Sequence, residues 1–297
     1  MQVVVVHYRT PGLLRRCLRS LFSGSIIPSR VVVVDSASGD DSFRDIVKYY
    51  PAAEAISLSE NRGFGWAANI GMSECDGEYV AILNADVFVE EYCLENLAKT
   101  LGSNTDWAIA APMLLSVDGS VQSSGYNFPG IVDAFKDLAP DFKAYWAGHK
   151  SLTIGPDDSV RTIGYPLGAI MLFKKIIFDQ VGGFDERYFL YSEEIDLCRR
   201  ISNMGHNVGY VPSARAVHIG GASTKQDRLS SVIHLYVSKL TYFYRHHSKL
   251  YALAAHVNVL IGLSINPAKN ILPGQESLQL TPAGYWKLFC EIIRYRP

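Results

Sequence analysis

Apolar runs without polar alternation recur through the first hundred residues, and segments with helical spacing separate them. The first two runs consist of valine alone, and each run has the length of a strand that is buried on both faces. The segments between them place apolar residues three and four positions apart, which is typical of helices that cover a sheet. This alternation predicts an α/β fold with a parallel sheet and right-handed crossovers. The predicted strands are 3–6, 31–34, 55–58 and 79–83, and the predicted helices are 13–22, 43–50, 66–75 and 92–101.

The pattern changes after residue 108. Strand-like runs at 108–115, 121–125 and 162–173 are separated by a long polar and aromatic excursion from 126 to 158. A loop of this length in a compact domain usually has a function, such as that of a lid or a substrate wall. The small residues Gly220-Gly221-Ala222-Ser223 precede a shift in charge, so we expect a domain edge near residue 224.

Length and composition limit the class of protein. At 297 residues the chain is long enough for one large α/β domain and an appendage, and 48% hydrophobic with 19% charged residues is an ordinary globular composition. Its five cysteines are odd in number, far apart and without a CxxC pair, which favours a reducing compartment and disfavours a zinc site or a disulfide framework. The first apolar run ends at His7, too early for a signal peptide, so we expect a cytoplasmic protein.

Charge is distributed unevenly along the chain. Residues 225–297, the second predicted domain after residues 1–224, carry nine Lys and Arg against three acids, a net charge of +6. The rest of the chain carries −7, because the total is −1. A basic, aromatic-rich helical segment suits docking on an anionic membrane surface, and equally suits packing on the main domain or on a second subunit. The longest apolar stretch, 250–265, is shorter than the roughly 20 residues that a membrane-spanning helix needs.

Polar side chains follow the predicted strands, at the edge where open α/β folds bind ligands. Asp35 comes directly after the run 31–34 and can accept hydrogen bonds from a nucleobase or a ribose hydroxyl. The same residue, followed by Ser36 and Ser38, also suits an ordinary turn or a helix N-cap. Asp35 is therefore a candidate binding residue with a second, purely local explanation.

The segment Asn61 to Asn69 combines two glycines, two asparagines and Arg62 immediately before a predicted helix. Glycine lets the backbone approach a ligand closely, and a helix N-terminus favours phosphate. The spacing is not the G-x-G-x-x-G of a dinucleotide-binding turn, and the chain has no P-loop sequence. A plain loop-to-helix junction explains the segment equally well.

Asn84-Ala85-Asp86 follows the strand 79–83, and His218 follows another short apolar run. A carboxylate and an imidazole together suit Mn²⁺ or Mg²⁺, and the imidazole favours Mn²⁺. A cation there would neutralise the charge that gathers on a leaving diphosphate, while Asn84 adds an amide oxygen without charge. Helix capping by Asn-Ala-Asp and a structural role for a lone histidine are the alternatives.

Three acids, Glu193, Glu194 and Asp196, open a predicted helix after an apolar, aromatic stretch. Acids in a first helical turn are stabilised by the helix dipole, and Ser192 is a good N-cap, so structural roles would explain them. The apolar stretch implies, however, that these acids emerge from the core at a rim, where a general base is useful. The spacing also predicts an ion pair between Asp196 and an arginine three or four residues later.

Taken in order, these segments resemble the family 2 glycosyltransferases, most closely the rhamnosyltransferase-like members with the GT-A fold. The resemblance covers roughly residues 2–224. Its most specific part is Gly182 to Arg200, which reads Gly-Gly-Phe-Asp-Glu-Arg-Tyr-Phe-Leu-Tyr-Ser-Glu-Glu-Ile-Asp-Leu-Cys-Arg-Arg. The other matching segments are Val-Val-Asp-Ser-Ala-Ser at 33–38, the segment 61–69, Asn-Ala-Asp at 84–86 and the histidine segment 218–223.

The resemblance implies a metal-dependent, inverting glycosyltransferase with a GT-A fold, built on a Rossmann-like mixed sheet, and a C-terminal helical extension. Glu194, the second acid of its motif, corresponds to the general base that would deprotonate the acceptor hydroxyl. Asp86 with His218 would bind Mn²⁺ or Mg²⁺ at the donor diphosphate. The residues expected to bind the nucleotide or the substrate are Tyr8, Asp35, Asn61, Arg62, Gly63, Asn69, Asn84, Glu193 and Asp196.

The resemblance further implies a nucleotide-sugar donor, dTDP-L-rhamnose in the first place and a UDP-sugar in the second. The acceptor would be a growing surface polysaccharide or a lipid-linked saccharide, which gives the basic tail a membrane to contact at its inner face. No nucleic-acid partner is expected. Three residues depart from the family pattern: Glu194 replaces Asp, and Arg9 and Ser36 each replace Asn.

Two other functions stay open at this point. One is a nucleotide-sugar binding protein without catalysis, given the exchange at Glu194. The other is a sugar-phosphate nucleotidylyltransferase, which shares the sheet architecture. That class needs a Gly-rich, basic loop after the first strand, where this chain has a single glycine, Gly12.

Overall fold

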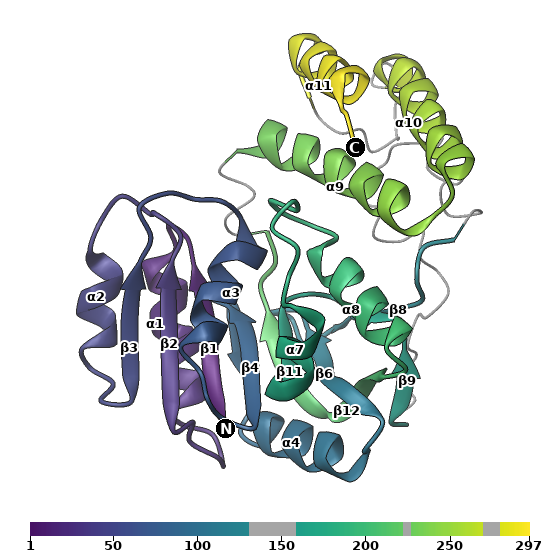
Figure 1. Ribbon diagram of the computed structural model, residues 1–297. Helices are drawn as coiled ribbons and strands as arrows, with labels where there is room; N and C mark the ends of the chain where they lie inside the picture. The colour runs from purple at the N-terminus through teal and green to yellow at the C-terminus, as the bar shows by residue number, and fades with distance from the viewer. Residues whose placement is uncertain (131–158, 222–226, 270–279) are drawn as a thin grey trace.

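The computed structural model describes residues 1–130, 159–221, 227–269 and 280–297. Within these ranges the chain forms a large mixed sheet with helices on both faces, and three C-terminal helices lie above it in the view of Figure 1. The excursion predicted from 126 to 158 lies largely outside the described residues, so its assignment as a lid or substrate wall stays a prediction.

Four parallel strands form the first half of the sheet, as the valine-rich runs predict. β1 (Gln2–His7) lies between β2 (Arg30–Asp35) and β4 (Tyr79–Asn84), and β3 (Ala53–Ser57) pairs with the outer side of β2. Because these strands are parallel, they all end at one edge of the sheet. This edge brings together the polar residues that follow β1, β2 and β4.

The second half of the sheet mixes strand directions. β11 (Ile170–Lys174) runs antiparallel to its neighbours β4 and β6 (Trp107–Leu115). β12 (Asn207–His218) is parallel to β6, and β5 (Val87–Val89) closes the order antiparallel to β12. The mixed sheet implied by the resemblance is thus confirmed, and the run of uninterrupted parallel neighbours is limited to β1 to β4.

Several elements differ from those that the apolar pattern predicts. The run 162–173 is three strands: β9 (Arg161–Ile163), β10 (Tyr165–Pro166) and β11. Gly164 separates the first two, and a Cβ on it would lie 2.7 Å from the backbone nitrogen of Phe128. Pro166 cannot donate a hydrogen bond to a sheet ladder. The strand predicted at 121–125 is two short strands, β7 (Val121–Gln122) and β8 (Gly125–Tyr126). The strand β5 and the helix α7 (Lys175–Val181) were not predicted from the apolar pattern.

Alternate residues of each buried strand face opposite helical layers. Val4 and Val6 pack in one core cluster with α3 (Phe64–Ser73) and α8 (Glu193–Asn203). Val3 and Val5 pack in a second cluster, on the other face of the sheet. Both faces of the strands are therefore apolar, which explains why they appear in the sequence as continuous valine runs. The helices of the second cluster are α1 (Pro11–Leu21), α2 (Ser42–Val47) and α4 (Cys93–Ser103).

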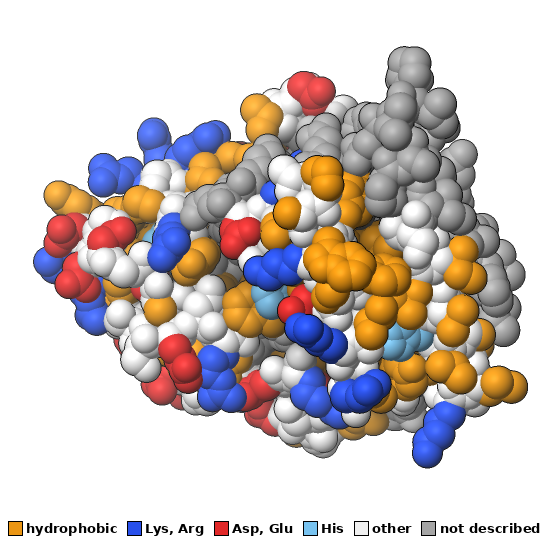
Figure 2. Space-filling model, turned by 90° about the horizontal axis from the view of Figure 1, so that it is seen from above, with side chains coloured by type: hydrophobic (Ala, Val, Ile, Leu, Met, Phe, Trp, Pro, Cys, Tyr) orange, Lys and Arg blue, Asp and Glu red, His pale blue; other side chains and the backbone are white. Residues whose placement is uncertain are grey.

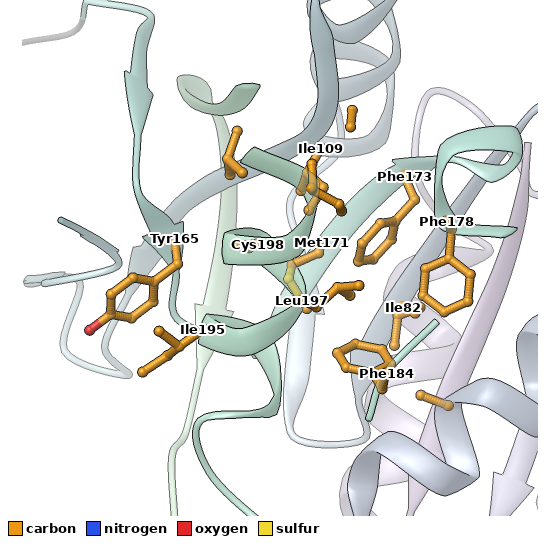
Figure 3. Close-up of a cluster of buried hydrophobic side chains, with 14 of the residues drawn as sticks. Ile82, Ile109, Tyr165, Met171, Phe173, Phe178, Phe184, Ile195, Leu197 and Cys198 are labelled. Carbon is orange, nitrogen blue, oxygen red and sulfur yellow. The ribbon is translucent and has the colours of Figure 1, made fainter. Parts of the chain in front are cut away.

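The helix α8 is fixed to the sheet by its apolar side. Leu197 and Cys198 of α8 lie beside Met171 of β11, and the rings of Phe173, Phe178 and Phe184 continue this cluster (Figure 3). Phe178 meets Phe173 and Phe184 edge to face, with ring centroids 5.2 Å and 5.8 Å away. Such aromatic contacts stabilise the cluster beyond the burial of area alone, and they hold the acidic first turn of α8 in place.

The C-terminal segment forms three helices with a core of their own: α9 (Arg228–His246), α10 (Lys249–Lys269) and α11 (Pro282–Arg294). In addition, Tyr242, Phe243, Ala252 and Ala255 join the core cluster on the α8 side of the sheet. The tail therefore packs on the main domain, which is one of the arrangements that the sequence left open. Of the helices in the described ranges, none is both long enough and apolar enough to cross a bilayer.

Candidate functional site

A buried hydrogen-bonded pair lies where β1 and β2 end. His7 and Asp35 are register partners in the sheet, and His7 Nδ1 lies 2.8 Å from Asp35 Oδ1. The backbone N–H of Thr10 donates to His7 Nε2 at 3.0 Å, so Nε2 is the acceptor and Nδ1 carries the proton that is donated to Asp35. His7 was not among the predicted site residues. The available signal was its place at the end of a strand next to the strand of Asp35.

Asp35 is held as an ionised carboxylate. The backbone N–H of Ser38 donates to Asp35 Oδ2 at 2.9 Å, and the Ser38 hydroxyl donates to Oδ1. Burial alone would raise the pKa of Asp35, but the hydrogen bonds from His7 and Ser38 outweigh it and hold this pKa below its ordinary value. An ionised carboxylate with a fixed orientation suits the recognition of N–H or O–H groups of a ligand.

The turn after β1 is tied to the same pair. The backbone N–H of Arg9 donates to Ser38 Oγ at 2.8 Å, and its guanidinium lies 5.0 Å from the ring centre of Tyr8. Arg9 has a φ of 52° and Ala37 a φ of 59°, which non-glycine residues rarely adopt. The half-exposed Tyr8 therefore stands next to the loop of Asp35, as a nucleotide-binding residue would.

A carboxylate and an imidazole meet beyond the end of β4. Asp86 lies in the turn between β4 and β5, and His218, the last residue of β12, pairs with Val87 at the start of β5. His218 Nε2 lies 3.7 Å from Asp86 Oδ1, and each side chain is nine-tenths buried. The pairing of β12 with β5 thus brings together two residues that are 132 positions apart in the sequence.

Gln122 on β7 fixes the orientation of this imidazole. Its Nε2 donates to the backbone oxygen of His218 at 2.7 Å, and its Oε1 accepts from His218 Nδ1 at 3.0 Å. Burial lowers the pKa of His218, and the nearby Asp86 carboxylate opposes this effect only in part. The lowered pKa favours a neutral ring, with its proton on Nδ1 toward Gln122 and Nε2 on the side of Asp86. This is the outer hydrogen bond that metal-binding histidines usually have, and the sequence alone did not point to Gln122.

The donor set fits a divalent cation with an open coordination sphere. Ligands at about 2.1 Å from one ion lie about 3 Å apart when adjacent, close to the observed Asp86–His218 separation. No group of three or more His, Cys, Asp or Glu side chains suited to an ion exists in the part of the chain that the structure describes. Among the described residues, Asp86 and His218 are thus the two side chains that would hold such a cation.

A strained turn delivers two glutamates to the interior. Tyr191 and Ser192 have φ values of 69° and 65°, and α8 begins with Glu193 and Glu194, both more than nine-tenths buried. Ser192 stands at the predicted N-cap position, but its side chain makes no capping hydrogen bond. The reason is its left-handed backbone, since a capping residue requires extended dihedral angles. Left-handed non-glycine residues of this kind concentrate at functional sites.

Glu194 lies close to the end of β4. A Cβ on Gly168 would lie 3.4 Å from the Cβ and Cγ of Glu194, and the next residue, Ala169, accepts a hydrogen bond from the backbone N–H of Asn84 at 2.9 Å. Burial raises the pKa of Glu194 to about 7, against backbone hydrogen bonds that act in the opposite direction. A carboxylate with this pKa accepts a proton readily near neutral pH.

Glu193 is the more strongly perturbed of the pair. Burial and then the adjacent Glu194 raise the pKa of Glu193 well above its ordinary value. Its Oε2 has no hydrogen-bond partner within the described residues. Two neighbouring carboxyls with separated proton affinities allow one to stay protonated while the other ionises.

The segment from Asn61 to Asn69 contacts the chain that leads to the Tyr191–Ser192 turn. Gly63 has a φ of 103°, and a Cβ there would lie 2.0 Å from the backbone oxygen of Phe189. The Asn61 side chain accepts from the Gly63 N–H at 3.0 Å. Asn69 bonds both backbone groups of Phe184, its Nδ2 donating to the oxygen and its Oδ1 accepting from the N–H, each at 2.9 Å. These predicted binding residues thus position the 184–192 segment.

Two further predicted residues lie away from the buried centre. Arg62 is half-exposed, with its guanidinium 4.9 Å from the ring centre of Trp66 and 3.4 Å from Glu186. Asp196 is fully buried and forms the predicted ion pair with Arg200 at 2.7 Å. Both oxygens of its carboxylate have protein partners, so the interactions of Asp196 in this structure are with the protein itself.

Comparison with known proteins places this geometry in context. Residues 2–176 match the model of "Glycosyl transferase family 2". The chain is 29% identical over 248 residues to the N-acetylglucosaminyl-diphospho-decaprenol L-rhamnosyltransferase of Mycobacterium tuberculosis, covering 77% of this chain and 79% of that protein. It is 28% identical over 185 residues to the rhamnosyltransferase WbbL of Escherichia coli, covering 59% and 67% of the two chains.

Solved structures confirm the fold. The mannosyltransferase PcManGT of Pyrobaculum calidifontis, in complex with GDP-Man and Mn²⁺, superposes with a TM-score of 0.56 at 18% identity. The match covers 98% of this chain and 84% of that one. The GT-A fold expected from the sequence is therefore correct.

The raised pKa of Glu194 makes stability depend on pH. Its folded value near 7 exceeds the ordinary 4.5, so the folded state binds this proton more tightly than the unfolded state. Ionisation therefore destabilises the fold as pH rises through this window, by on the order of 1–3 kcal/mol above it. Glu194→Gln should have a higher Tm than wild type at pH 8 and lose most of that advantage at pH 5.

The exposed Glu90→Gln serves as the control for this measurement and should change Tm equally little at both pH values. An advantage of Glu194→Gln that is the same at pH 5 and pH 8 would contradict a raised pKa at this position.

Proposed function

The chain belongs to family 2 of the glycosyltransferases, and on that premise we propose an inverting, metal-dependent transfer of rhamnose from a nucleotide-diphosphate donor to a saccharide or lipid-linked acceptor. The observation that carries the proposal is the meeting of three groups at one sheet edge. These are the ionised Asp35, the Asp86–His218 pair with its imidazole fixed by Gln122, and the buried Glu194.

Each group has a distinct task in this proposal. Asp35 accepts hydrogen bonds from the base or ribose of the donor, and its own bonds to His7 and Ser38 keep it oriented. Asp86 and His218 hold Mn²⁺ or Mg²⁺, which when bound stabilises negative charge on the leaving diphosphate. Glu194 takes the proton of the acceptor hydroxyl while that oxygen attacks the anomeric carbon opposite the diphosphate. One displacement of this kind inverts the configuration.

The relatives support the choice of substrates. Two of them are named rhamnosyltransferases, and the name of the mycobacterial protein describes a saccharide on a diphospho-polyprenol. We therefore propose dTDP-L-rhamnose as donor before a UDP-sugar, and a lipid-linked saccharide as acceptor in the synthesis of a surface polysaccharide. The raised pKa of Glu194 favours a catalytic protein over a nucleotide-sugar binder, because a binding site has no need of a base poised near neutral pH.

Donor and metal binding can be measured by thermal shift. With Mn²⁺ present, dTDP at about 100 times its Kd should stabilise the protein by about 2.7 kcal/mol, which corresponds to several degrees in Tm. Asp86→Ala should abolish the part of the shift that requires metal. Asp76→Ala is the matched control, because Asp76 precedes the opposite end of the same strand, β4. Absence of any shift with dTDP, UDP or GDP in wild type would overturn the donor site.

Turnover tests the base. Glu194→Gln should lower kcat by about 10²- to 10⁴-fold, because the acceptor proton loses its acceptor group. In wild type, kcat/KM should rise with pH up to about 7, where Glu194 becomes ionised, and then level off. Glu194→Asp, the residue usual in the family, should retain part of the activity. Full activity of Glu194→Gln would show that Glu194 is not the base and that another group deprotonates the acceptor. Absence of turnover by wild type with every donor would favour the non-catalytic nucleotide-sugar binder.

A lipid-linked acceptor requires access to a membrane, and we propose peripheral binding at the cytoplasmic face. The outer side of α10 has no charged residue from Leu250 to Ser264, and its Leu250, Leu253, Val257 and Ile261 are between 46% and 79% exposed. Trp286 and Ile293 of α11 are also exposed. Figure 2 shows hydrophobic side chains gathered on the face seen from above, with Lys and Arg side chains around them. The adjacent exposed cations are Lys249, Lys287, Arg294 and Arg296.

Vesicle co-sedimentation tests this surface. Wild type should bind phosphatidylcholine vesicles that contain anionic phosphatidylglycerol, and Leu253→Gln/Val257→Gln should bind at least about ten-fold more weakly, since each lost apolar contact is worth roughly 1–2 kcal/mol. Ile176→Gln, an equally exposed apolar residue on α7, is the control and should bind like wild type. A dimer that the double variant dissociates, without vesicle binding by wild type, would assign this surface to a second copy.

A further inference from the structure

A second set of charges lies behind the catalytic turn and joins α8 to α9. Asp196, two residues after Glu194, has no solvent exposure. Its Oδ2 accepts from Arg200 Nε at 2.7 Å. Its Oδ1 accepts from His246 Nε2 at 2.7 Å and lies 3.0 Å from Arg245 Nε. The Tyr188 hydroxyl is a further donor to Oδ1, at 3.5 Å. Arg245 and His246 belong to the last turn of α9, which lies outside residues 2–176 that match the family model.

The same helix contacts the segment that leads to Glu194. Arg245 Nη1 lies 3.0 Å from Asp185 Oδ2. Ser238 Oγ donates to the backbone oxygen of Leu190 at 2.8 Å. The ring of His234 stacks on Phe189 with centroids 4.2 Å apart. From its middle to its end, α9 therefore holds the chain from 185 to 190 and the helix that follows.

These contacts surround the turn at Tyr191 and Ser192, whose backbone conformation is strained. Tyr191 and Ser192 are both left-handed, at a cost of order 1–3 kcal/mol each, and Ser192 provides no capping bond. Such a conformation persists only when neighbouring structure imposes it. On one side Phe64 donates its N–H to the Phe189 oxygen at 3.0 Å, and on the other side α9 supplies the contacts of Ser238, Arg245 and His246.

We propose that Arg245 and His246 are positioning residues of the transferase: through Asp196, with Ser238 on Leu190, α9 sets the direction in which Glu194 faces the acceptor hydroxyl. The inference rests on the proposed role of Glu194 as the base. The C-terminal extension is then a part of the acceptor side of the active site, in addition to any role at a membrane. The donor side is formed by Asp35, Asp86 and His218. The residues that hold these side chains, His7, Ser38 and Gln122, do not belong to α9, so the donor side should not respond.

Steady-state kinetics with a water-soluble acceptor test this assignment. Arg245→Gln should lower kcat by about 10- to 100-fold, since small misplacements of a catalytic group cost up to about 10²-fold. The KM for the donor and the metal-dependent thermal shift with dTDP should stay at wild-type values. Arg245→Lys, which keeps the charge, should recover part of kcat. Arg19→Gln, an exposed arginine in the last turn of α1, is the control and should keep the kcat of wild type.

A milder variant tests the same role in case Arg245→Gln does not fold. Ser238→Ala removes the one hydrogen bond to Leu190 and leaves the ion pairs intact, and it should lower kcat several-fold with an unchanged donor KM. In a double-mutant cycle, Asp196→Asn and Arg245→Gln should be less than additive in their effect on kcat, because each breaks the same link.

The outcomes separate this inference from the function on which it rests. If Glu194→Gln abolishes turnover while folded Arg245→Gln and Ser238→Ala both keep the kcat of wild type, the positioning role is wrong and the transferase stands. If Arg245→Gln raises the donor KM as much as it lowers kcat, α9 has a general structural role and the proposal is overturned. If Glu194→Gln leaves turnover unchanged, the proposed base itself fails.

Discussion

The buried carboxylate of Asp196 is the charge on which the arrangement of the site depends. An ion taken out of water costs several kcal/mol unless well-placed partners compensate for it, so each partner of Asp196 is constrained. Arg200 bonds Asp196 and also donates to the backbone oxygens of Val181 at 2.9 Å and Gly183 at 2.7 Å. Arg245 and His246 bring in α9. One charge thereby links the start of the 182–200 motif, the helix α8 and the C-terminal extension.

The site separates two carboxylates by their surroundings. Asp35 is buried but receives hydrogen bonds on both oxygens, and its pKa falls. Glu194 is buried with backbone hydrogen bonds that are too weak to offset desolvation, and its pKa rises to about 7. The same chemical group is thus a fixed anion at position 35 and a group able to take up a proton near neutral pH at position 194. The surroundings, and not the residue type alone, set these two pKa values. A glutamate at position 194, where the family usually has Asp, can therefore still accept a proton near neutral pH.

The sequence predicted the strands and the residues at their ends, but not the side-chain contacts between residues far apart in the chain. The continuous apolar runs located β1 to β4, and parallel strands with polar ends placed Asp35 and Asp86 at one edge. Asn69 and Asp196 looked like ligands because they belong to a motif, yet their side chains bond Phe184, Arg200 and α9. The partners His7, Gln122, Arg245 and His246 were not predicted. Each lies 28 to 96 positions from its contact, and no periodicity in a single sequence records such a pairing.

The boundary predicted near residue 224 marks a change in composition. The packing is continuous across it, because one core cluster contains residues from both sides. The family model ends at residue 176, before α8 provides the candidate base, and the cations that compensate Asp196 come from residues 245 and 246. Tyr242 and Phe243 belong to the same core cluster as the inner face of α8. A strained turn needs support from outside itself, and here that support lies beyond the boundary. The packing unit therefore includes α9, which contacts α8 on one side and packs with α10 and α11 on the other.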